Sequence, residues 1–409
     1  MPTISPPAWT GRVASFLGLR RSTVALLLMV ILVGLGERMA ERFLPIYLLA
    51  LGGSIIAIGL LSGLQNLLGA LYAFPGGYLS DRLGTKRAFL VFNLLSLFGY
   101  LVVIIIPHWA AVLVGACFFL TWSAISLPAT MSLVSQVLPK EKRTMGVSLH
   151  SLIRRVPMAL GPVLGGALIG WYGERNGVRL AFVLAAFLCL VSIFFQELLI
   201  QEQARPARPE KNPLRLWRHL SPDLKNLLLS DILIRFAEQI PYAFVVVWCM
   251  KSVGVSALQF GVLTSIEMAT ALLVYIPVAW LADRSTKKPF VVATFVFFTL
   301  FPGVLFFSRS LPLLVLAFVL RGLKEFGEPT RKALIMDLAP EDRKAGTFGL
   351  YYLVRDVVVS LAAFGGAFLW RASPALNLWV ATGFGLLGTV YFASFGRDLC
   401  PTRKLASSK

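Results

Sequence analysis

Charged residues are scarce in this 409-residue sequence, at 14% of all residues, against about 25% in a typical soluble domain. Hydrophobic residues make up 57% of the chain, and the mean hydropathy is +0.76. A water-soluble fold of this length could not bury so much apolar surface, which leaves the lipid bilayer as the solvent. Most apolar runs are about 20 residues or longer and do not alternate with period two, which predicts spanning helices rather than barrel strands.

Cysteine and histidine are also rare, and neither type gathers into a metal-binding or catalytic cluster. No C-x-x-C pair occurs, and the isolated residues are Cys117, Cys189, Cys249, Cys400, His108, His150 and His219. The sequence has no G-x-x-x-x-G-K-[ST] phosphate loop and no soluble stretch large enough for an ATPase domain. We therefore expect no bound metal, no cofactor and no enzymatic activity, and an ion or solute gradient must supply the energy for any transport.

Twelve apolar segments fall into two groups of six around one long polar stretch. They lie at residues 22–49, 54–79, 88–106, 110–137, 146–171, 179–199, 225–250, 257–282, 290–308, 312–338, 346–370 and 376–396. The first is too long for the apolar core of a signal peptide, so we interpret it as a retained span. The sequence predicts an all-α membrane protein with six-helix bundles at residues 1–200 and 225–409, the second ending in a short cytoplasmic tail. The proline-rich, charged residues 201–224 form the predicted linker.

Basic residues produce a net charge of +19 and cluster in short loops between the apolar runs. This placement argues against nucleic-acid binding, which needs a basic face or stripe. The basic loops follow spans two, four, six, eight and ten, and basic residues flank both ends. Because such loops stay in the cytoplasm, we predict a multi-pass protein of the cytoplasmic (inner) membrane with both termini cytoplasmic.

An internal repeat relates the two groups of spans. A shift of 201 or 202 residues superposes similar residues in the same order. The matches include Pro128 on Pro329, Pro139 on Pro340, Arg154 on Arg355, Gly165 on Gly366, Asp81 on Asp283 and Arg82 on Arg284. This pattern predicts two pseudo-symmetric halves, as in many secondary transporters.

The loop after the second span reads GYLSDRLGTKR from Gly77 to Arg87. It resembles the G-x-x-x-D-R-x-G-x-K-R motif of the major facilitator superfamily, and Ala279, Asp283, Arg284, Lys287 and Lys288 resemble a degenerate second copy. The resemblance implies the twelve-helix major facilitator fold, with an aspartate that latches onto the partner half near the start of span eleven. The gating residues would be Gly77, Asp81, Arg82, Gly84, Lys86, Arg87, Asp283 and Arg284. A loop that only fixes topology is the alternative.

Two shorter resemblances point to transporter subgroups. Gly161, Pro162, Gly165 and Gly166 in span five are similar to the G-P-x-x-G-G core of drug–proton antiporters, and such residues permit helix bending and close approach. Simple helix packing is the alternative interpretation. The run Glu41 to Phe43 in span one is similar to part of the E-x-x-E-R-F motif of proton-coupled peptide transporters.

Ionisable residues inside spans cost about 2.5–3.5 kcal/mol each, so they usually face a cavity or a partner. The carboxylates are candidates for proton coupling: Glu37, Glu41, Asp231, Glu238, Glu267, Glu325, Glu328 and Asp356. The cations are candidates for substrate binding or charge pairing: Arg38, Arg42, Arg154, Arg235, Arg321, Lys324 and Arg355. Gly327 and Pro329 predict a break in span ten near Glu328. Static ion pairing between helices is the alternative role for these charges.

These observations predict a monomeric secondary transporter that works by alternating access. Its expected partners are a small-molecule substrate, protons or another cation, and the lipid bilayer, with no nucleic acid. Proton-coupled export of small amphipathic compounds is the first hypothesis, based on the G-P-x-x-G-G core. Proton-coupled uptake of a polar or anionic metabolite or peptide is the second, based on the many cations. A non-transporting sensor or scaffold on the same fold is the third.

Overall fold

The computed structural model describes residues 21–119, 122, 140–200, 220–282, 286–339 and 344–397. These residues are almost entirely helical, and none of them lies in a strand. The helices before residue 201 are α2 (Arg21–Glu41), α3 (Leu44–Ala50), α4 (Ile55–Leu83), α5 (Thr85–Ile105), α6 (Trp109–Phe119) and α8 (Lys140–Leu199). Those after residue 219 are α9 (Pro222–Tyr242), α10 (Val245–Val247), the π-helix η2 (Trp248–Val253), α11 (Ala257–Ala282), α12 (Lys288–Phe307), α13 (Leu311–Leu323), α14 (Glu328–Leu338), α15 (Lys344–Ala372) and α16 (Pro374–Phe395).

Each predicted span overlaps a described helix, although most of span four lies outside the described residues. Within the described residues, seven helical segments are long and apolar enough to cross a membrane on their own, or eight with the bent pair formed by α9 and the α10–η2 segment. One of the seven holds predicted spans five and six, which meet at Gly173, where φ is +79°. A glycine allows this turn because it has no Cβ. Helix α9 begins at Pro222 after a Ser221 N-cap, so the last three residues of the predicted linker are helical.

The first span of each half is broken at the same place. Helix α2 ends at Glu41 and α3 starts at Leu44, while α9 ends at Tyr242 and α10 starts at Val245. The Phe43 N–H donates to the Ala40 carbonyl at one break, and the Phe244 N–H donates to the Pro241 carbonyl at the other. All these positions are 201 residues apart, the offset of the predicted internal repeat. Neither break was predicted, although Pro45 removes one helical hydrogen bond at the first.

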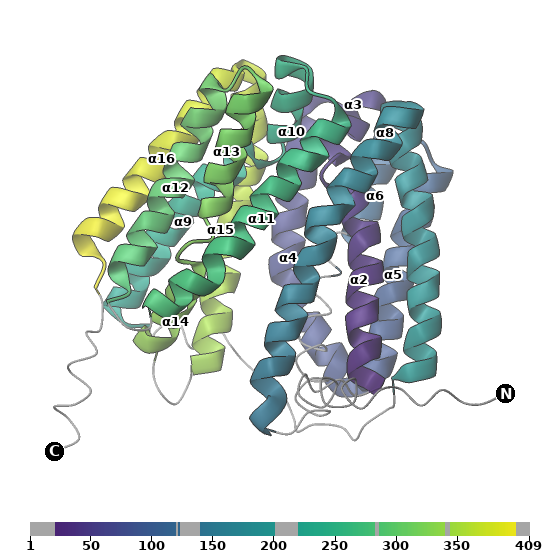
Figure 1. The fold of residues 1–409 in the computed structure, drawn as a ribbon, viewed down its shortest axis with the longest axis horizontal. Coiled ribbons are helices and arrows are strands. Elements are labelled where there is room, and N and C mark those ends of the chain that lie inside the picture. Colours follow the sequence, from purple (N-terminus) through teal and green to yellow (C-terminus); the bar gives the residue numbers. More distant parts are fainter. Residues whose placement is uncertain are drawn as a thin grey trace.

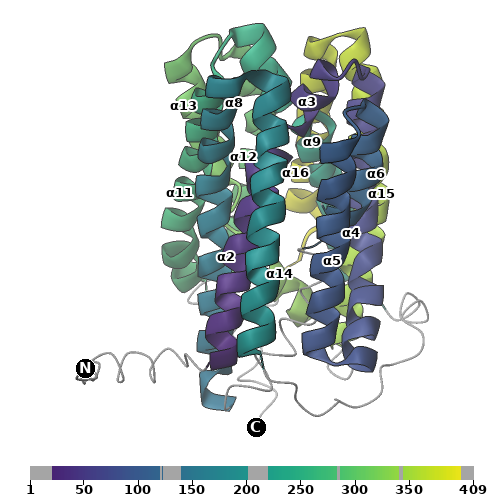
Figure 2. The ribbon, with the colours of Figure 1, turned by 90° about the vertical axis from the view of Figure 1, so that its right-hand side faces the viewer.

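Two helical lobes stand side by side with their helices roughly parallel (Figures 1 and 2). The lobes meet where α4 packs on α15 and where α8 packs on α11. Small residues allow the helices to approach closely: Gly59 faces Ala367, and Gly166 faces the Ala257 backbone. Small residues at helix interfaces are the usual solution in membranes, where lipid tails compete for larger apolar side chains.

Among the described residues, the apolar core clusters join the lobes at one end only. The largest core cluster takes residues from both lobes, with Phe43 and Tyr47 on one side and Phe244, Trp248 and Phe260 on the other. At the opposite end, where α2 begins and α16 ends, each lobe has its own separate cluster. We call the first the sealed end and the second the terminal end. In the part of the chain that the structure describes, the lobes are therefore packed shut against each other at the sealed end and have separate apolar cores at the terminal end.

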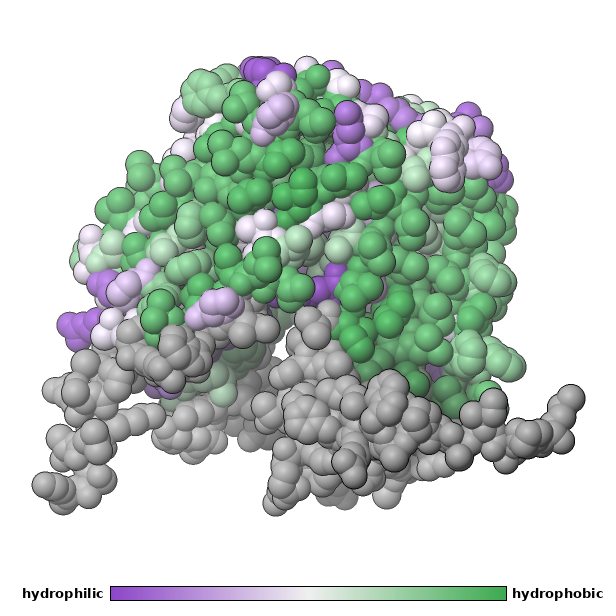
Figure 3. Space-filling view, in the orientation of Figure 1, coloured by the Kyte–Doolittle hydropathy of each residue, from purple (hydrophilic) through white to green (hydrophobic). Residues whose placement is uncertain are grey.

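A broad apolar band covers the outer face of both lobes, with hydrophilic residues at the sealed end (Figure 3). Helices α5, α12, α16 and the second part of α8 each expose several large apolar side chains. These helices correspond to predicted spans three, nine, twelve and six. In the lower half of the same view, the surface between the lobes is hollowed and shows hydrophilic atoms.

Candidate functional site

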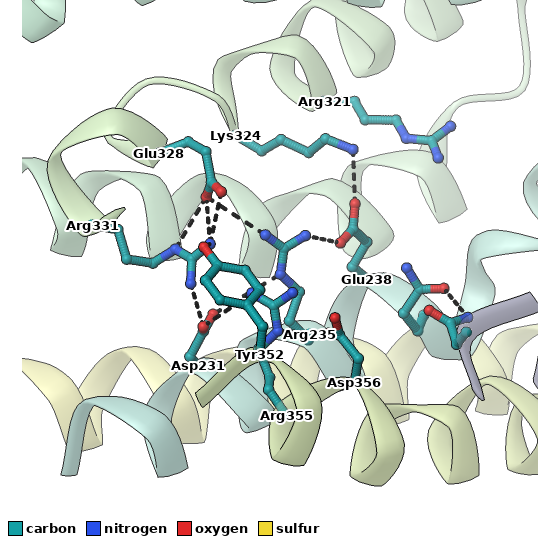
Figure 4. Close-up of polar contacts among 12 residues, drawn as sticks. Asp231, Arg235, Glu238, Arg321, Lys324, Glu328, Arg331, Tyr352, Arg355 and Asp356 are labelled. Atoms are coloured by element: carbon teal, nitrogen blue, oxygen red, sulfur yellow. Dashed lines mark hydrogen bonds and ion pairs between the residues drawn. The ribbon is translucent and has the colours of Figure 1, made fainter. Parts of the chain in front are cut away.

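Arg331 is the centre of a buried charge cluster in the second lobe (Figure 4). Only 1% of its side chain is exposed, and its guanidinium donates to the carboxylates of Asp231 and Glu328. Asp231 also accepts from the Tyr351 hydroxyl at 3.0 Å and from Arg355 at 3.3 Å. Every one of these groups is buried and partnered, as a charge removed from water requires. The arrangement ties α9, α14 and α15 together.

A second chain of ion pairs leads from this cluster towards the first lobe. Arg235 lies 3.5 Å from Glu328 and donates to Glu238 at 2.6 Å. Lys324 donates to the other Glu238 oxygen at 2.8 Å. Helix α13 ends at Leu323, and a turn separates it from α14 at Glu328. This turn confirms the predicted break in span ten and places Lys324 between α9 and α11.

Glu267 of α11 is the second carboxylate within reach of Lys324. Its Oε1 lies 3.2 Å from the Lys324 Nζ and 3.4 Å from the Arg321 Nε. The Arg321 guanidinium also stacks on the rings of Phe301 and Tyr242, with centroids at 5.0 and 5.5 Å. Neither Glu267 oxygen has a hydrogen-bond partner among the described residues.

The first lobe contributes a smaller polar group from α2 and α4. Arg38 pairs with Glu41, which also accepts from the Gln65 amide at 2.8 Å. Two contacts cross to the second lobe: Asn66 donates to Gln239 at 3.1 Å, and Arg42 lies over the Tyr242 ring at 5.1 Å. Among the described residues, no carboxylate lies within 4 Å of Arg42 or of Arg154 on α8. The first lobe therefore presents two cations, Arg42 and Arg154, without an ion pair in the described part of the chain.

A pocket lies between the lobes at the two helix breaks. Its polar lining is Glu41, Arg42, Ser62, Gln65, Tyr242 and Arg321, and its apolar lining includes Leu44, Pro45, Leu61, Val245, Val246 and Phe260. The pocket has room for only a few water molecules. Binding a larger solute there requires the lobes to move apart.

The structure assembles most, but not all, of the residues predicted from sequence. Glu325 turns away from the cluster and lies 3.7 Å from Arg155 of α8, so residues 321–328 do not share one helical face. Asp356 is partly exposed at the edge, paired with Arg355 at 2.7 Å, and Glu37 is buried in α2. Arg331 was not among the predicted site residues, although its place in a charged run after the break is a visible signal.

The predicted gating motif is only partly described. Gly84 adopts a positive φ of 83° and starts α5, as a tight turn requires. Arg82 and Arg87 are exposed, and Lys86 donates to the Glu197 carbonyl at 2.8 Å. Asp283 and Arg284 lie outside the described residues, and the structure describes neither the Asp81 side chain nor the surroundings of Gly77. The latch therefore stays a prediction.

The G-P-x-x-G-G residues make packing contacts. A Cβ on Gly161 would meet Arg38, one on Gly165 would overlap the Met39 carbonyl, and one on Gly166 would overlap the Ala257 carbonyl. The Pro162 carbonyl in turn faces Gly261 of α11. Close approach of α8 to α2 and α11 therefore accounts for these residues.

One exposed ion pair links the lobes at the sealed end. Lys251 of η2 donates to Glu174, just after the Gly173 turn, at 2.6 Å. An exposed pair contributes about 0.2–1 kcal/mol. We expect Lys251→Glu to open this end in about 1.5- to 5-fold more molecules, because the attraction becomes a repulsion. Spin-label distances across the sealed end measure this population, and the double swap Glu174→Lys with Lys251→Glu should restore it. Unchanged distances in Lys251→Glu would rule out a role for the pair in closure.

Comparison with known proteins gives the same architecture. The sequence matches the Major Facilitator Superfamily model over residues 26–236 and again over 227–407. An uncharacterised MFS-type transporter of Methanocaldococcus jannaschii is 22% identical over 84% of this chain and 87% of its own. The staphylopine export protein of Staphylococcus aureus is 23% identical over 90% and 93%.

Two solved structures share the fold. A POT family transporter in complex with 5-aminolevulinic acid superposes with a TM-score of 0.75 at 13% identity, covering 90% of this chain and 96% of that one. A bacterial homologue of the iron transporter ferroportin, in its inward-facing state, gives 0.72 at 16% identity, covering 92% and 99%.

Apolar helices in two lobes around a charged centre define a multi-pass membrane transporter rather than an enzyme. The chain belongs to the Major Facilitator Superfamily.

Proposed function

We propose that this chain exports small amphipathic solutes that carry an acidic group, and that export is coupled to protons. The observation that carries the proposal is the pocket at the helix breaks. Its apolar wall suits the body of such a solute, while Arg42 and Arg321 supply charge-assisted hydrogen bonds for a carboxylate or phosphate. Arg42 has no ion pair with any described residue to give up when a solute binds, which lowers the cost of binding.

The two lobes would be the moving parts of the cycle. In our proposal, residues 1–200 and 225–409 rock about the pocket, with 201–224 as the cytoplasmic linker and the terminal end facing the cytoplasm. The basic loops support this orientation. The divided terminal end and the apolar seal at the other end correspond to a form open towards the cytoplasm, from which an exported solute would enter.

Export is supported by the staphylopine export protein, whose likeness extends over nine-tenths of both chains. One observation favours uptake as a second candidate. Arg321 lines the pocket and also pairs with Glu267. An acidic solute bound to Arg321 would partly neutralise the positive charge beside Glu267, which would favour protonation of that carboxylate. Solute and proton would then load together, which an inward proton gradient would drive as uptake.

Flux in proteoliposomes separates the two directions. A thermal-stability screen on the purified protein would first compare hydrophobic monocarboxylates and dipeptides with cationic amphiphiles as the counter-set. We expect the acidic compounds to stabilise the protein, by mass action. A stabilising compound is then followed under an imposed pH gradient. Export predicts movement of the solute against the proton flow, uptake predicts movement with it, and indifference to the gradient would overturn proton coupling.

Arg42→Gln should weaken binding of an acidic solute about 10- to 100-fold, because a charge-assisted hydrogen bond contributes about 1.5–3 kcal/mol. The concentration dependence of the stability shift measures this loss. Arg309→Gln is a matched control: Arg309 also lies over an aromatic ring, that of Trp248 at 4.5 Å, but is exposed and does not line the pocket. Equal affinity in wild type and Arg42→Gln would remove Arg42 from the substrate site.

A further inference from the structure

Glu267 is the least satisfied of the central carboxylates. It is 0% exposed, yet neither of its oxygens has a hydrogen bond among the described residues. Asp231, Glu238 and Glu328 each accept at least two hydrogen bonds. Oε1 of Glu267 has ion-pair contacts with Lys324 at 3.2 Å and Arg321 at 3.4 Å but no hydrogen bond to any described residue. A buried carboxylate satisfied so incompletely calls for an explanation. A carboxyl group that gains and loses a proton provides one, because its neutral form costs less to bury.

Each of the two cations beside Glu267 has a second interaction partner. Lys324 already donates to Glu238 at 2.8 Å, closer than its 3.2 Å contact with Glu267. Arg321 stacks on aromatic rings and lines the pocket. Protonation of Glu267 would therefore leave Lys324 with Glu238 and leave Arg321 without a carboxylate, facing the pocket. Loss of the proton would draw both cations back.

The contact between α11 and α13 fixes this geometry through the backbone. A Cβ on Gly322 would meet the Glu267 carbonyl oxygen at 2.6 Å, so the two helices touch at this level. Two further charged groups act on Glu267: Arg42, just after α2, and Glu238 of α9, which shares Lys324 with it. Helices α8 and α14 also pack on α11, and their charged residues are paired elsewhere: Arg155 of α8 with Glu325, and Arg331 of α14 with Glu328.

The geometry points to Glu267 as the residue that takes up and releases the transported proton. Arg321, which pairs with Glu267 and lines the pocket, would be freed for the solute when Glu267 is protonated. This inference rests on the proton coupling proposed above. Asp231 and Glu328, both bonded to Arg331, would serve structure. The step involves one proton, which passes between water and a Glu267 oxygen, and the two cations rearrange around the result.

Infrared difference spectra of the purified protein test Glu267 directly, with protons as the only ligand. The chain has 20 Asp and Glu residues, so between alkaline and acidic buffer we expect a protonated-carboxyl band with several components in wild type, and the loss of one component in Glu267→Gln. Asp223→Asn is the control, since Asp223 lies in the first turn of α9 near Arg397 and away from the pocket. A band that persists unchanged in Glu267→Gln would overturn the assignment.

A second variant and a second readout separate this inference from the proposed function. Glu267→Asp keeps a carboxyl group at a shifted position, so its component of the band should remain with an altered pH midpoint. An unaltered midpoint there would overturn the assignment even if Glu267→Gln does not fold. A wild-type protein whose solute flux ignores a pH gradient would refute proton-coupled transport, whereas the infrared component lost in Glu267→Gln reports on Glu267 alone.

Discussion

Arg331→Met is expected to destabilise the protein by about 3–5 kcal/mol, the typical cost of leaving a buried charge without its partner. The guanidinium is 1% exposed and joins Asp231 to Glu328. Without it, Asp231 keeps Arg355 and Tyr351, but Glu328 keeps only the longer contacts to Arg235 and Lys332. Methionine fills similar space and supplies no charge, so the loss reports the electrostatic role rather than a cavity.

Lys332→Met is the matched control for this experiment. Lys332 is the next residue along α14, its side chain is 46% exposed, and its only described ion pair is with Glu328 at 3.4 Å. An exposed pair of this kind contributes less than about 1 kcal/mol. The midpoint of thermal unfolding in detergent should therefore fall sharply for Arg331→Met and hardly for Lys332→Met. Similar midpoints for the two variants would contradict the buried cluster.

Arg331 also shows what the sequence could not give. The helix positions were predictable, because hydrophobicity along one segment decides whether that segment spans. The charged spans could be named for the same reason. Which charges pair depends on helix rotation and on contacts between residues such as Asp231 and Arg331, which are 100 residues apart. A pair between residues so far apart in the chain cannot be predicted from local sequence, so Arg331, beside the helix break, is not among the predicted site residues.

The broken first spans illustrate the same limit. The break in span ten was predicted from Gly327 and Pro329 and is present. At the breaks in spans one and seven the prolines stand at positions that are not equivalent, Pro45 in α3 and Pro241 in α9, yet the breaks are 201 residues apart. The positions of the helix breaks therefore follow the internal repeat more closely than the positions of the prolines do. Near each break the same kind of packing occurs within the lobe, with Gly165 on Met39 in the first and Gly366 on Ile240 in the second.

Substitution of the two equivalent glycines should show that this packing is needed in both lobes. A Cβ on Gly165 would overlap the Met39 carbonyl, and one on Gly366 would overlap the Ile240 carbonyl, both backbone atoms that cannot rotate away. The helix pairs α8–α2 and α15–α9 must separate to admit a methyl group. Overpacking of this kind costs about 1–3 kcal/mol or more. We therefore expect Gly165→Ala and Gly366→Ala to lower the thermal midpoint and the yield of folded protein.

Neighbouring glycines in the same helices supply the controls. A Cβ at Gly365 or Gly170 would meet nothing within 4 Å, and alanine is the better helix former by about 1 kcal/mol. Gly365→Ala and Gly170→Ala should therefore leave the midpoint unchanged or raise it. If Gly366→Ala behaves like Gly365→Ala, the close helix contact does not exist in the folded protein. If Gly366→Ala is destabilised and Gly165→Ala is not, the two lobes are not packed alike, and a pocket built on equivalent breaks loses its structural basis.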